Sequence, residues 1–305
     1  MARTLLPPTT RGLVTTPQGA ALFDPIVKFT EWIQARTEFI DGGLDAFLSS
    51  PVCNDSNGKA LECNVVLFGA GYDTRALRYR HAHDDKINFM EVDLADVVEG
   101  KGKLYKKFQR ENDPDWDVEN KGSTLVPFNL NDCGGEAPKS LIGALRDAGL
   151  KEGVPTMFVW EAVLFYVDED AVRNIMGELF DFAGPKGNAG AETMLCFTGE
   201  FVAVCDNIGG FIEPFSHLQF MVRATTDSLK PFVDVPFTSE TNTWFSSRGV
   251  DLLQHRSRWG GAVHFALAAS RGFVNNSDGT TTVSSSSKER EITGTLGKYV
   301  ADKVG

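Results

Sequence analysis

Short apolar runs recur along the first two thirds of the chain, and amphipathic segments separate them. The runs are rich in β-branched and aromatic residues, as is typical of buried strands, and occupy residues 65–68, 87–93, 125–130, 156–161 and 191–198. Apolar positions at helical spacing predict intervening helices at residues 76–79, 97–109, 138–149 and 168–183, the last with Asp168 as N-cap. Because strands and helices alternate, we predict an α/β fold with a doubly wound, mostly parallel sheet.

The two ends of the chain have weaker patterns. Apolar positions at helical spacing predict an N-terminal helical region at 24–48, which Gly42 and Gly43 divide into two helices. We expect one structural domain, with a mobile arm and helical cap at 1–62 and the core, with C-terminal substrate-side elements, at 63–305. Beyond the alternating region we predict a helix at 201–223, a loop and helix at 232–247, a strand at 263–269 and a solvated loop at 275–287.

Two glycines follow the first predicted strand directly. Gly69 and Gly71 allow backbone angles that other residues avoid, and they let a ligand approach the main chain closely. A strand, a glycine turn and the start of a helix form the typical nucleotide-binding arrangement. The third glycine of that motif is absent, because Thr74 stands in its place. Taken alone, the pattern fits a cofactor site and an ordinary tight turn equally well.

Polar residues also mark the ends of the following strands. Asp93, Asn129 and Glu161 each lie at the carboxyl end of a predicted strand, the edge at which open α/β sheets bind ligands. Glu91 and Asp93 lie about 20 residues beyond the glycines and share a face of their strand, so either carboxylate is a candidate acceptor for ribose hydroxyls. We prefer Asp93, which is nearer the strand end; the alternative role is a helix N-cap or a surface acid.

Asp73 decides between two classes of cofactor. A carboxylate in the glycine turn would repel the pyrophosphate of a dinucleotide but attract an amino group. This disfavours NAD and favours S-adenosylmethionine, which carries an α-amino group and a sulfonium cation. Arg75 or Arg36 is then the candidate partner for the carboxylate of the cofactor, in forked geometry. The alternative for each arginine is a surface ion pair.

Composition narrows the class of protein further. The chain has 305 residues, 42% of them hydrophobic, and a formal net charge of -11, which argues against a general nucleic-acid binder. It has no apolar run of about 20 residues and no secretory signal at its start, so we expect neither a membrane span nor secretion. The five cysteines include no C-x-x-C, which favours a reduced, cytoplasmic protein without zinc or another metal.

Three segments together resemble the leucine carboxyl methyltransferase family. Residues 65–75 (VVLFGAGYDTR) are similar to its glycine motif, and residues 89–93 (FMEVD) to its second motif. Residues 155–166 (PTMFVWEAVLFY) are similar to its third motif, and the order and spacing of the three agree. The resemblance covers roughly residues 24–200 and implies an S-adenosylmethionine-dependent O-methyltransferase with a Rossmann-like class I sheet and an added helical cap.

The resemblance also implies roles for individual residues. The turn of Gly69, Ala70 and Gly71 would line the methionine part of the cofactor, Asp93 would hold its ribose, and Glu161 would lie beside it. Arg36 matches the family's N-terminal arginine that binds the cofactor carboxylate. Asn129-Leu130 replaces the usual Asp-Leu that faces the adenine amino group, although an asparagine carbonyl can still accept from that group. Residues 34–37 differ from the member that esterifies the C-terminal leucine of protein phosphatase 2A.

The chemistry of the acceptor stays open. A carboxylate acceptor is ionised at neutral pH and needs no general base, whereas a hydroxyl needs one, for which His217 and His255 are candidates. Tyr166 and Arg36 are candidates for orienting the acceptor, a small-molecule carboxylate or a protein C-terminus. Two other functions remain, a non-catalytic S-adenosylmethionine-binding protein of the same fold and an NAD(P)-dependent oxidoreductase. The sequence gives neither the acceptor nor the oligomeric state.

Overall fold

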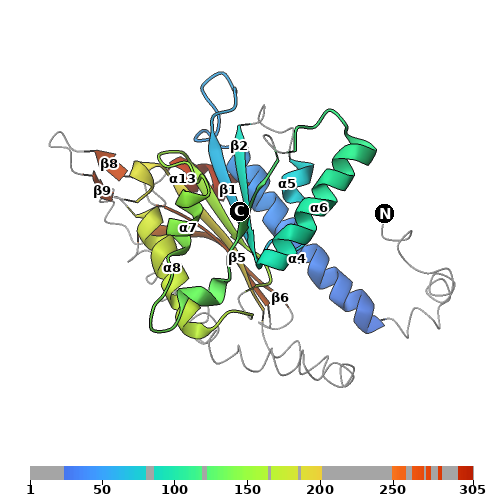
Figure 1. Cartoon of the computed structure of the whole chain (residues 1–305). Helices are drawn as coiled ribbons and strands as arrows, with labels where there is room; N and C mark the ends of the chain where they lie inside the picture. Colours follow the sequence, from blue (N-terminus) through green and yellow to red (C-terminus); the bar gives the residue numbers. More distant parts are fainter. Residues whose placement is uncertain are drawn as a thin grey trace. The chain divides into compact units, whose positions relative to one another are not determined.

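The computed structural model describes residues 24–79, 86–118, 122–163, 166–184, 187–200, 249–258, 263–270, 273–275, 281–283 and 295–304. The chain forms two compact units, Met1–Asp41 and Gly42–Gly305. The described part of the first unit belongs to helix α4 (Asp24–Leu48), and the second unit contains the sheet (Figure 1). The predicted domain boundary at residue 62 stays a prediction.

A seven-stranded sheet forms the centre of the second unit. Its strands are β1 (Cys63–Phe68), β2 (Ile87–Asp93), β3 (Thr124–Pro127), β4 (Thr156–Trp160), β5 (Thr193–Glu200), β6 (Val250–Arg258) and β7 (Val263–Ser270). The spatial order is β3-β2-β1-β4-β5-β7-β6. The first five strands are parallel, and β7 pairs antiparallel with both β5 and β6. This confirms the predicted fold class, an α/β fold with a mostly parallel, Rossmann-like sheet.

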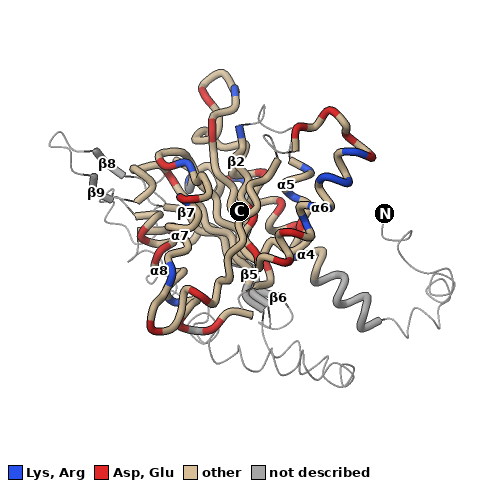
Figure 2. Tube along the Cα trace, viewed as in Figure 1, with Lys and Arg blue, Asp and Glu red and all other residues tan. Residues whose placement is uncertain are grey.

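Helices connect the parallel strands. They are α5 (Arg75–Arg78), α6 (Ala95–Asn112), α7 (Leu141–Asp147) and α8 (Glu169–Ala183), with the short 3-10 helices η2 (Leu130–Cys133) and η4 (Asn188–Gly190). The last described helix, α13 (Thr295–Val304), packs near β6 and β7. On α6, acidic residues lie near both ends and basic residues lie between them (Figure 2), and apart from Lys101 these charged side chains are exposed.

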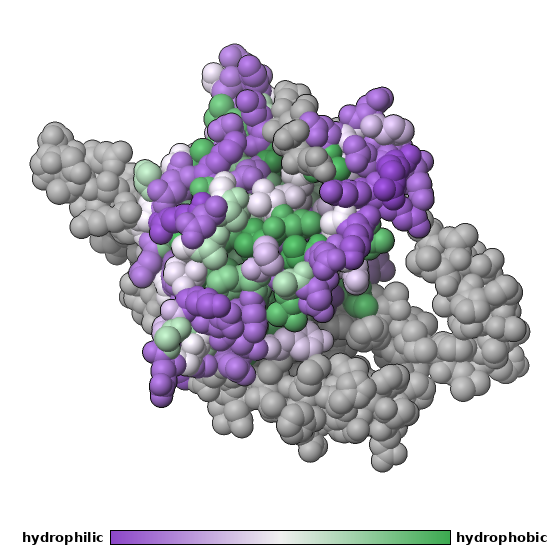
Figure 3. All heavy atoms as spheres, in the orientation of Figure 1, coloured by the Kyte–Doolittle hydropathy of each residue, from purple (hydrophilic) through white to green (hydrophobic). Residues whose placement is uncertain are grey.

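The core follows from the alternation of side chains along the strands. Val66 and Phe68 of β1 point to the same face as Phe158 of β4, and there they pack against α7 and α8 in one apolar cluster. Phe68 and Phe158 stack with their ring centroids 5.7 Å apart. On the side of the molecule that Figure 3 shows, apolar surface lies at the centre with hydrophilic residues around it. Burial on both faces explains why the strands read as continuous apolar runs.

The predicted break of the N-terminal helix at Gly42 and Gly43 is wrong, because α4 is continuous through both glycines. Gly43 has another purpose. A Cβ atom there would lie 3.3 Å from Leu267 Cδ1 and 3.7 Å from Cys196 Sγ. The missing side chain therefore lets the end of α4 approach strands β5 and β7 closely, and this packing compensates for the poor helix propensity of glycine.

Two predicted boundaries also differ from the structure. The third strand ends at Pro127 rather than at Leu130, because the Asn129 side chain accepts a hydrogen bond from the Asn131 amide and starts η2 there. Helix α7 starts at Leu141, where the Ser140 hydroxyl accepts from the Gly143 amide. Asp168 occupies the N-cap position of α8, as predicted, but its side chain makes no capping hydrogen bond.

The C-terminal third contains more strand than the sequence predicts. Strand β6 was not predicted, and part of the predicted solvated loop at 275–287 belongs to the hairpin β8 (Phe273–Asn275) and β9 (Thr281–Val283). The predicted strand at 263–269 corresponds to β7. The elements predicted at 201–223 and 232–247, with His217, lie outside the described residues, and so does the start of the region at 1–62, where a mobile arm was predicted.

Candidate functional site

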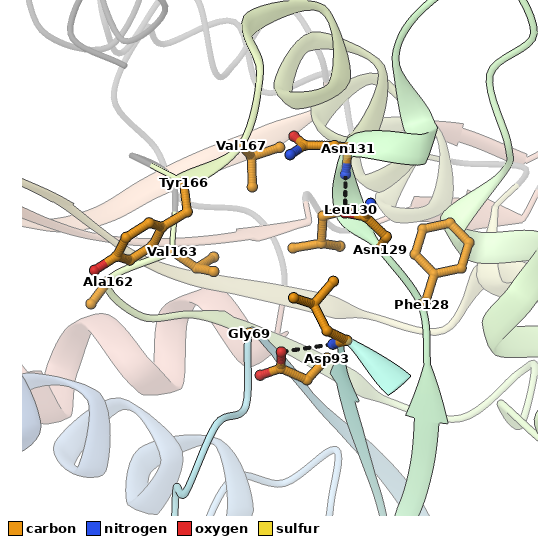
Figure 4. Close-up of a pocket in the computed structure, with 11 residues that line it drawn as sticks. Gly69, Asp93, Phe128, Asn129, Leu130, Asn131, Ala162, Val163, Tyr166 and Val167 are labelled. Atoms are coloured by element: carbon orange, nitrogen blue, oxygen red, sulfur yellow. Dashed lines mark hydrogen bonds between the residues drawn. The ribbon is translucent and has the colours of Figure 1, made fainter. Parts of the chain in front are cut away.

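A pocket of about 340 Å³ lies at the carboxyl edge of the parallel strands. Its volume falls within the range of small-molecule sites, and its walls come from the residues that follow β1, β2, β3 and β4. The lining residues are Gly69, Asp93, Leu94, Phe128, Asn129, Leu130, Asn131, Ala162, Val163, Tyr166 and Val167 (Figure 4). The structure thus brings together five residues that the sequence singled out: Gly69, Asp93, Asn129, Leu130 and Tyr166. Their roles stay predictions.

The glycine turn after β1 has the backbone that only glycine adopts readily. Gly69 has φ +58° and Gly71 has φ +39°, both in the left-handed region. The amides of the turn are bonded within the protein: the Ala70 amide donates to the Val92 carbonyl (3.0 Å), and the Gly71 amide donates to Asp93 Oδ2 (2.6 Å). These two bonds fix the turn to the end of β2.

Val163 closes the pocket over the first glycine. A Cβ atom built on Gly69 would lie 2.2 Å from Val163 Cγ2, so the structure has no room for a side chain there. The neighbouring residue Ala162 has φ +55°, which is uncommon for a residue with a side chain. Its amide donates to the buried hydroxyl of Thr198 (3.1 Å), which holds the strained segment after β4 in place.

Asp93 occupies the end of β2 with both carboxylate oxygens engaged. Oδ2 accepts from the Gly71 amide (2.6 Å) and Oδ1 accepts from the Leu94 amide (2.7 Å). A carboxylate has about four acceptor sites, so each oxygen keeps a lone pair for a further donor. The two backbone bonds therefore orient the carboxylate on the wall of the pocket while leaving it able to accept from a ligand.

Two asparagines form the opposite wall. Asn129 Oδ1 accepts from the Asn131 amide (3.1 Å), and Asn131 Oδ1 accepts from the Asp168 amide (2.7 Å). The first bond caps η2, and the second ties η2 to the start of α8. Part of the acceptor capacity of Asn129 is therefore used by the protein itself, which the sequence alone does not reveal.

Arg75 joins two carboxylates beside the glycine turn. Its Nη1 donates to Asp73 Oδ2 (2.6 Å) and to Glu161 Oε2 (2.5 Å), and the side chain is buried. The arginine is thus no surface ion pair, and it links the turn after β1 to the end of β4. The two ion pairs hold the Asp73 and Glu161 carboxylates beside the turn. None of the three residues lines the pocket as the structure presents it.

Glu91 lies apart from the pocket, contrary to its selection as a second candidate for the ribose. Its side chain is 1% exposed and pairs with Lys101 of α6, and its other oxygen accepts from the Tyr105 hydroxyl (2.6 Å). The positions of Glu91 and Asp93 along β2 explain why only Asp93 lines the pocket. Glu91 lies inside the paired part of β2, which α6 covers, whereas Asp93 is the last residue of the strand.

Other predicted residues are not tested by this geometry. Arg36 lies in α4 within the first unit, and its role stays a prediction. His255 lies in β6, but its side chain is not among the described ones. Tyr166 lines the pocket and is 46% exposed, so its ring is accessible to a ligand.

Sequence reasoning missed six residues of the pocket wall. They are mostly apolar neighbours of the predicted polar residues: Leu94, Phe128, Asn131, Ala162, Val163 and Val167. Several of them could have been predicted, because the sequence neighbours of a polar residue at the end of a strand lie at the same edge of the sheet. Within the described part of the chain no group of three or more His, Cys, Asp or Glu side chains is arranged to hold a metal ion. None of the described helices has the length and apolarity needed to cross a membrane.

Solved structures resemble the chain only weakly. A magnesium protoporphyrin IX methyltransferase from Synechocystis with bound S-adenosylhomocysteine has 12% identity and a TM-score of 0.40, over 78% of this chain and 84% of that one. The neocarzinostatin-pathway O-methyltransferase NcsB1 with S-adenosylmethionine has 13% identity and a TM-score of 0.37, over 67% and 48%. A pericyclic reaction enzyme has 10% identity and a TM-score of 0.38, over 71% and 45%, so this chain spans less than half of that protein.

The sequence itself gives a stronger result. None of the curated proteins compared matches the chain. The profile of the leucine carboxyl methyltransferase family matches residues 12–180, which is more than half of the chain and includes every wall of the pocket. The chain therefore belongs to the leucine carboxyl methyltransferase family, a family of S-adenosylmethionine-dependent methyltransferases.

Proposed function

We propose that the pocket binds S-adenosylmethionine and that the protein transfers its methyl group to a carboxylate oxygen of the acceptor. One observation carries the proposal. The Asp93 carboxylate, fixed by the Gly71 amide, lies on the wall of a pocket at the carboxyl edge of the sheet. Family membership supports the same reaction. The acceptor is a small-molecule carboxylate or a protein C-terminus.

The glycine turn fits an amino-acid end better than a pyrophosphate. A phosphate-binding turn offers free backbone amides to the ligand. Here the Ala70 and Gly71 amides already donate to Val92 and Asp93. Asp73 and Glu161 place two carboxylates beside the turn, which disfavours a phosphate there. These features argue against the NAD(P)-dependent oxidoreductase.

The pocket wall supplies suitable partners for the rest of the cofactor. Asp93 has free lone pairs for the ribose hydroxyls, which are donors. Leu94 and Phe128 provide apolar surface for a purine ring, and Asn129 provides an amide for its polar edge. Gly69 lines the same pocket, and its missing side chain makes room for Val163, which closes the wall there.

When bound, S-adenosylmethionine supplies an electrophilic methyl group on a sulfonium sulfur. The protein contributes alignment and a partly desolvated site, which strengthens electrostatic interactions there. In the described wall the titratable side chains are Asp93 and Tyr166, and Asp93 is held by two backbone amides. A carboxylate acceptor suits this wall because it is already ionised and needs no general base, its pKa being about 3.5. Tyr166, which lines the pocket, is our candidate for orienting the acceptor.

The acceptor class can be tested by methyl transfer from radiolabelled S-adenosylmethionine in lysate, followed by mild base. We expect label that base releases as methanol, since a carboxyl methyl ester is base-labile. Base-stable label would contradict the carboxylate and indicate an ether or an amine. Asp93→Ala should abolish labelling, whereas Glu99→Ala, which removes an exposed acid on α6, should label normally.

The non-catalytic alternative rests on Asn129, which stands where the family usually has an aspartate. It predicts that the protein binds S-adenosylhomocysteine but labels no acceptor. Labelling that depends on Asp93 would exclude it.

A further inference from the structure

A buried charged cluster lies between β2 and α6, away from the pocket wall. Lys101 of α6 is 3% exposed and Glu91 of β2 is 1% exposed. The Lys101 ammonium pairs with Glu91 Oε2, and the Tyr105 hydroxyl donates to Glu91 Oε1 (2.6 Å). Both oxygens of this buried carboxylate therefore have a partner, and neither charge takes part in the proposed reaction.

The ammonium also reaches the glycine turn. Lys101 Nζ donates to the Ala70 carbonyl (3.2 Å), which accepts as well from the Asp73 amide (2.8 Å). Ala70 lies between the two glycines with positive φ, where the backbone has the most freedom to rotate. Lys101 is thus a side chain from another element that restrains the peptide between Ala70 and Gly71, the peptide whose amide orients Asp93.

Burial makes the Lys101–Glu91 ion pair costly. Burying two charges costs solvation energy that their attraction often only balances, and an apolar pair of similar volume is frequently as stable or more stable. Such a pair is weak evidence for a gain in stability, so the feature to explain is its hydrogen bond to the glycine turn.

We propose that Lys101 and Glu91 are positioning residues for the cofactor turn: Glu91 holds the ammonium, and the ammonium holds the Ala70 carbonyl. The turn of Gly69 to Gly71 is then fixed from β2 through Asp93 and from α6 through Lys101. This inference rests on the proposed function, because the turn is taken to face the cofactor. It gives Glu91 an indirect role in place of the direct ribose contact that its position in the sequence suggests.

Tyr105 provides the matched control. Its hydroxyl binds the same carboxylate, but its hydrogen bond ends on Glu91 and does not continue to the turn. Burial, and next the Glu91 carboxylate, raise the pKa of the Tyr105 phenol far above its ordinary value, so the hydroxyl stays a donor at every working pH. Tyr105→Phe therefore perturbs the cluster without cutting its link to Ala70.

The test compares Tyr105→Phe with the double variant Lys101→Met/Glu91→Leu, in which no buried charge is left alone. In calorimetry, the double variant should bind S-adenosylhomocysteine at least about tenfold more weakly than the unaltered protein, because a shifted turn misplaces the ligand. Its thermal midpoint should fall no further than that of Tyr105→Phe, since both variants break the bond between the Tyr105 hydroxyl and Glu91. Tyr105→Phe should lower the midpoint and leave the affinity unchanged. Equal affinity of the double variant and the unaltered protein would overturn the proposal, as would an equal loss of affinity in Tyr105→Phe.

Hydrogen exchange separates this proposal from the proposed function. Without any ligand, the Ala70 and Gly71 amides should exchange faster in the double variant than in the unaltered protein, and at the unaltered rate in Tyr105→Phe. Faster exchange in a protein that binds no S-adenosylhomocysteine would contradict the proposed function but support the positioning role. Unchanged exchange in the double variant would overturn the positioning role, whatever the protein binds.

Discussion

Asp93 Oδ2 accepts a hydrogen bond of 2.6 Å from the Gly71 amide, which joins the end of β2 to the turn after β1. The bond sets two features of the pocket at once. It removes a backbone amide that a phosphate would need, and it points the remaining lone pairs of the carboxylate toward a ligand. The site is therefore suited to a ligand with hydroxyl donors and a positive charge.

Replacing Asp93 with asparagine removes the negative charge of the side chain and keeps its size. The oxygen of the new side-chain amide can accept from only one of the two backbone amides, Gly71 or Leu94, and its NH₂ group faces the other. We expect the affinity for S-adenosylhomocysteine to fall about tenfold or more, because a charge-assisted bond contributes about 1.5–3 kcal/mol. Calorimetry measures the affinity and thermal melting the stability. An unchanged affinity would contradict the assignment of Asp93 to the ribose.

Replacing Asn129 with aspartate should strengthen binding. Aspartate and asparagine are equally good N-caps, so the bond to the Asn131 amide and the stability of η2 should persist. A carboxylate offers only acceptors to the adenine amino group, whereas the amide also carries donors. We expect about threefold to tenfold tighter binding of S-adenosylhomocysteine, in line with about 1 kcal/mol for one hydrogen bond. Weaker binding would show that the ligand uses the NH₂ group of Asn129 as a donor.

Replacing Gly69 with alanine should damage both stability and binding. The new Cβ would lie 2.2 Å from Val163 Cγ2 at a positive φ, so the structure must shift. We expect a loss of about 1–3 kcal/mol of unfolding free energy, measured by denaturant titration, and loss of S-adenosylhomocysteine binding. The additional change Val163→Ala should restore part of the stability.

Gly42→Ala is the control for the Gly69 variant. Nothing lies within 4 Å of a Cβ at Gly42, which is inside α4. This substitution should stabilise the protein by about 0.5–1 kcal/mol through helix propensity. If Gly42→Ala and Gly69→Ala had the same effect, the close approach of Val163 would be of no consequence.

Glu192 should make stability depend on pH in the acid range. Burial is the main cause that raises the pKa of this carboxyl, against the opposing hydrogen bonds from the Leu296 and Thr295 amides. The folded pKa is then above the unfolded one, so this contribution to stability is complete below the unfolded pKa and is lost as pH rises through the folded pKa. Glu192→Gln should flatten the part of the profile that lies above the ordinary pKa of a glutamate, measured by denaturant titrations at a series of pH values. An unaltered profile would contradict the raised pKa.

The sequence predicts the sheet and its functional edge well, for a physical reason. Parallel strands are buried on both faces and stand out as apolar runs, and the polar residue that ends each run lies at the same edge. Asp93 and Asn129 were found in this way and do line the pocket. Gly69 was predicted because a glycine directly after a strand indicates a turn with backbone angles that other residues avoid.

Other features depend on contacts that local patterns do not contain. Arg75 pairs with Glu161, which lies 86 residues further along the chain. Lys101 pairs with Glu91, which lies ten residues earlier and on a different element. Gly43 looks like a helix breaker until β7 is seen beside it. Strand β6 was missed because its polar residues interrupt the apolar run, which an antiparallel edge strand tolerates.

Calorimetric titration of the unaltered protein with S-adenosylhomocysteine and, separately, with NAD shows which of the two ligands the pocket binds. We predict that one S-adenosylhomocysteine binds per chain with micromolar or tighter affinity and that NAD gives no heat of binding. Absence of S-adenosylhomocysteine binding at micromolar ligand, or binding of NAD in its place, would contradict the account.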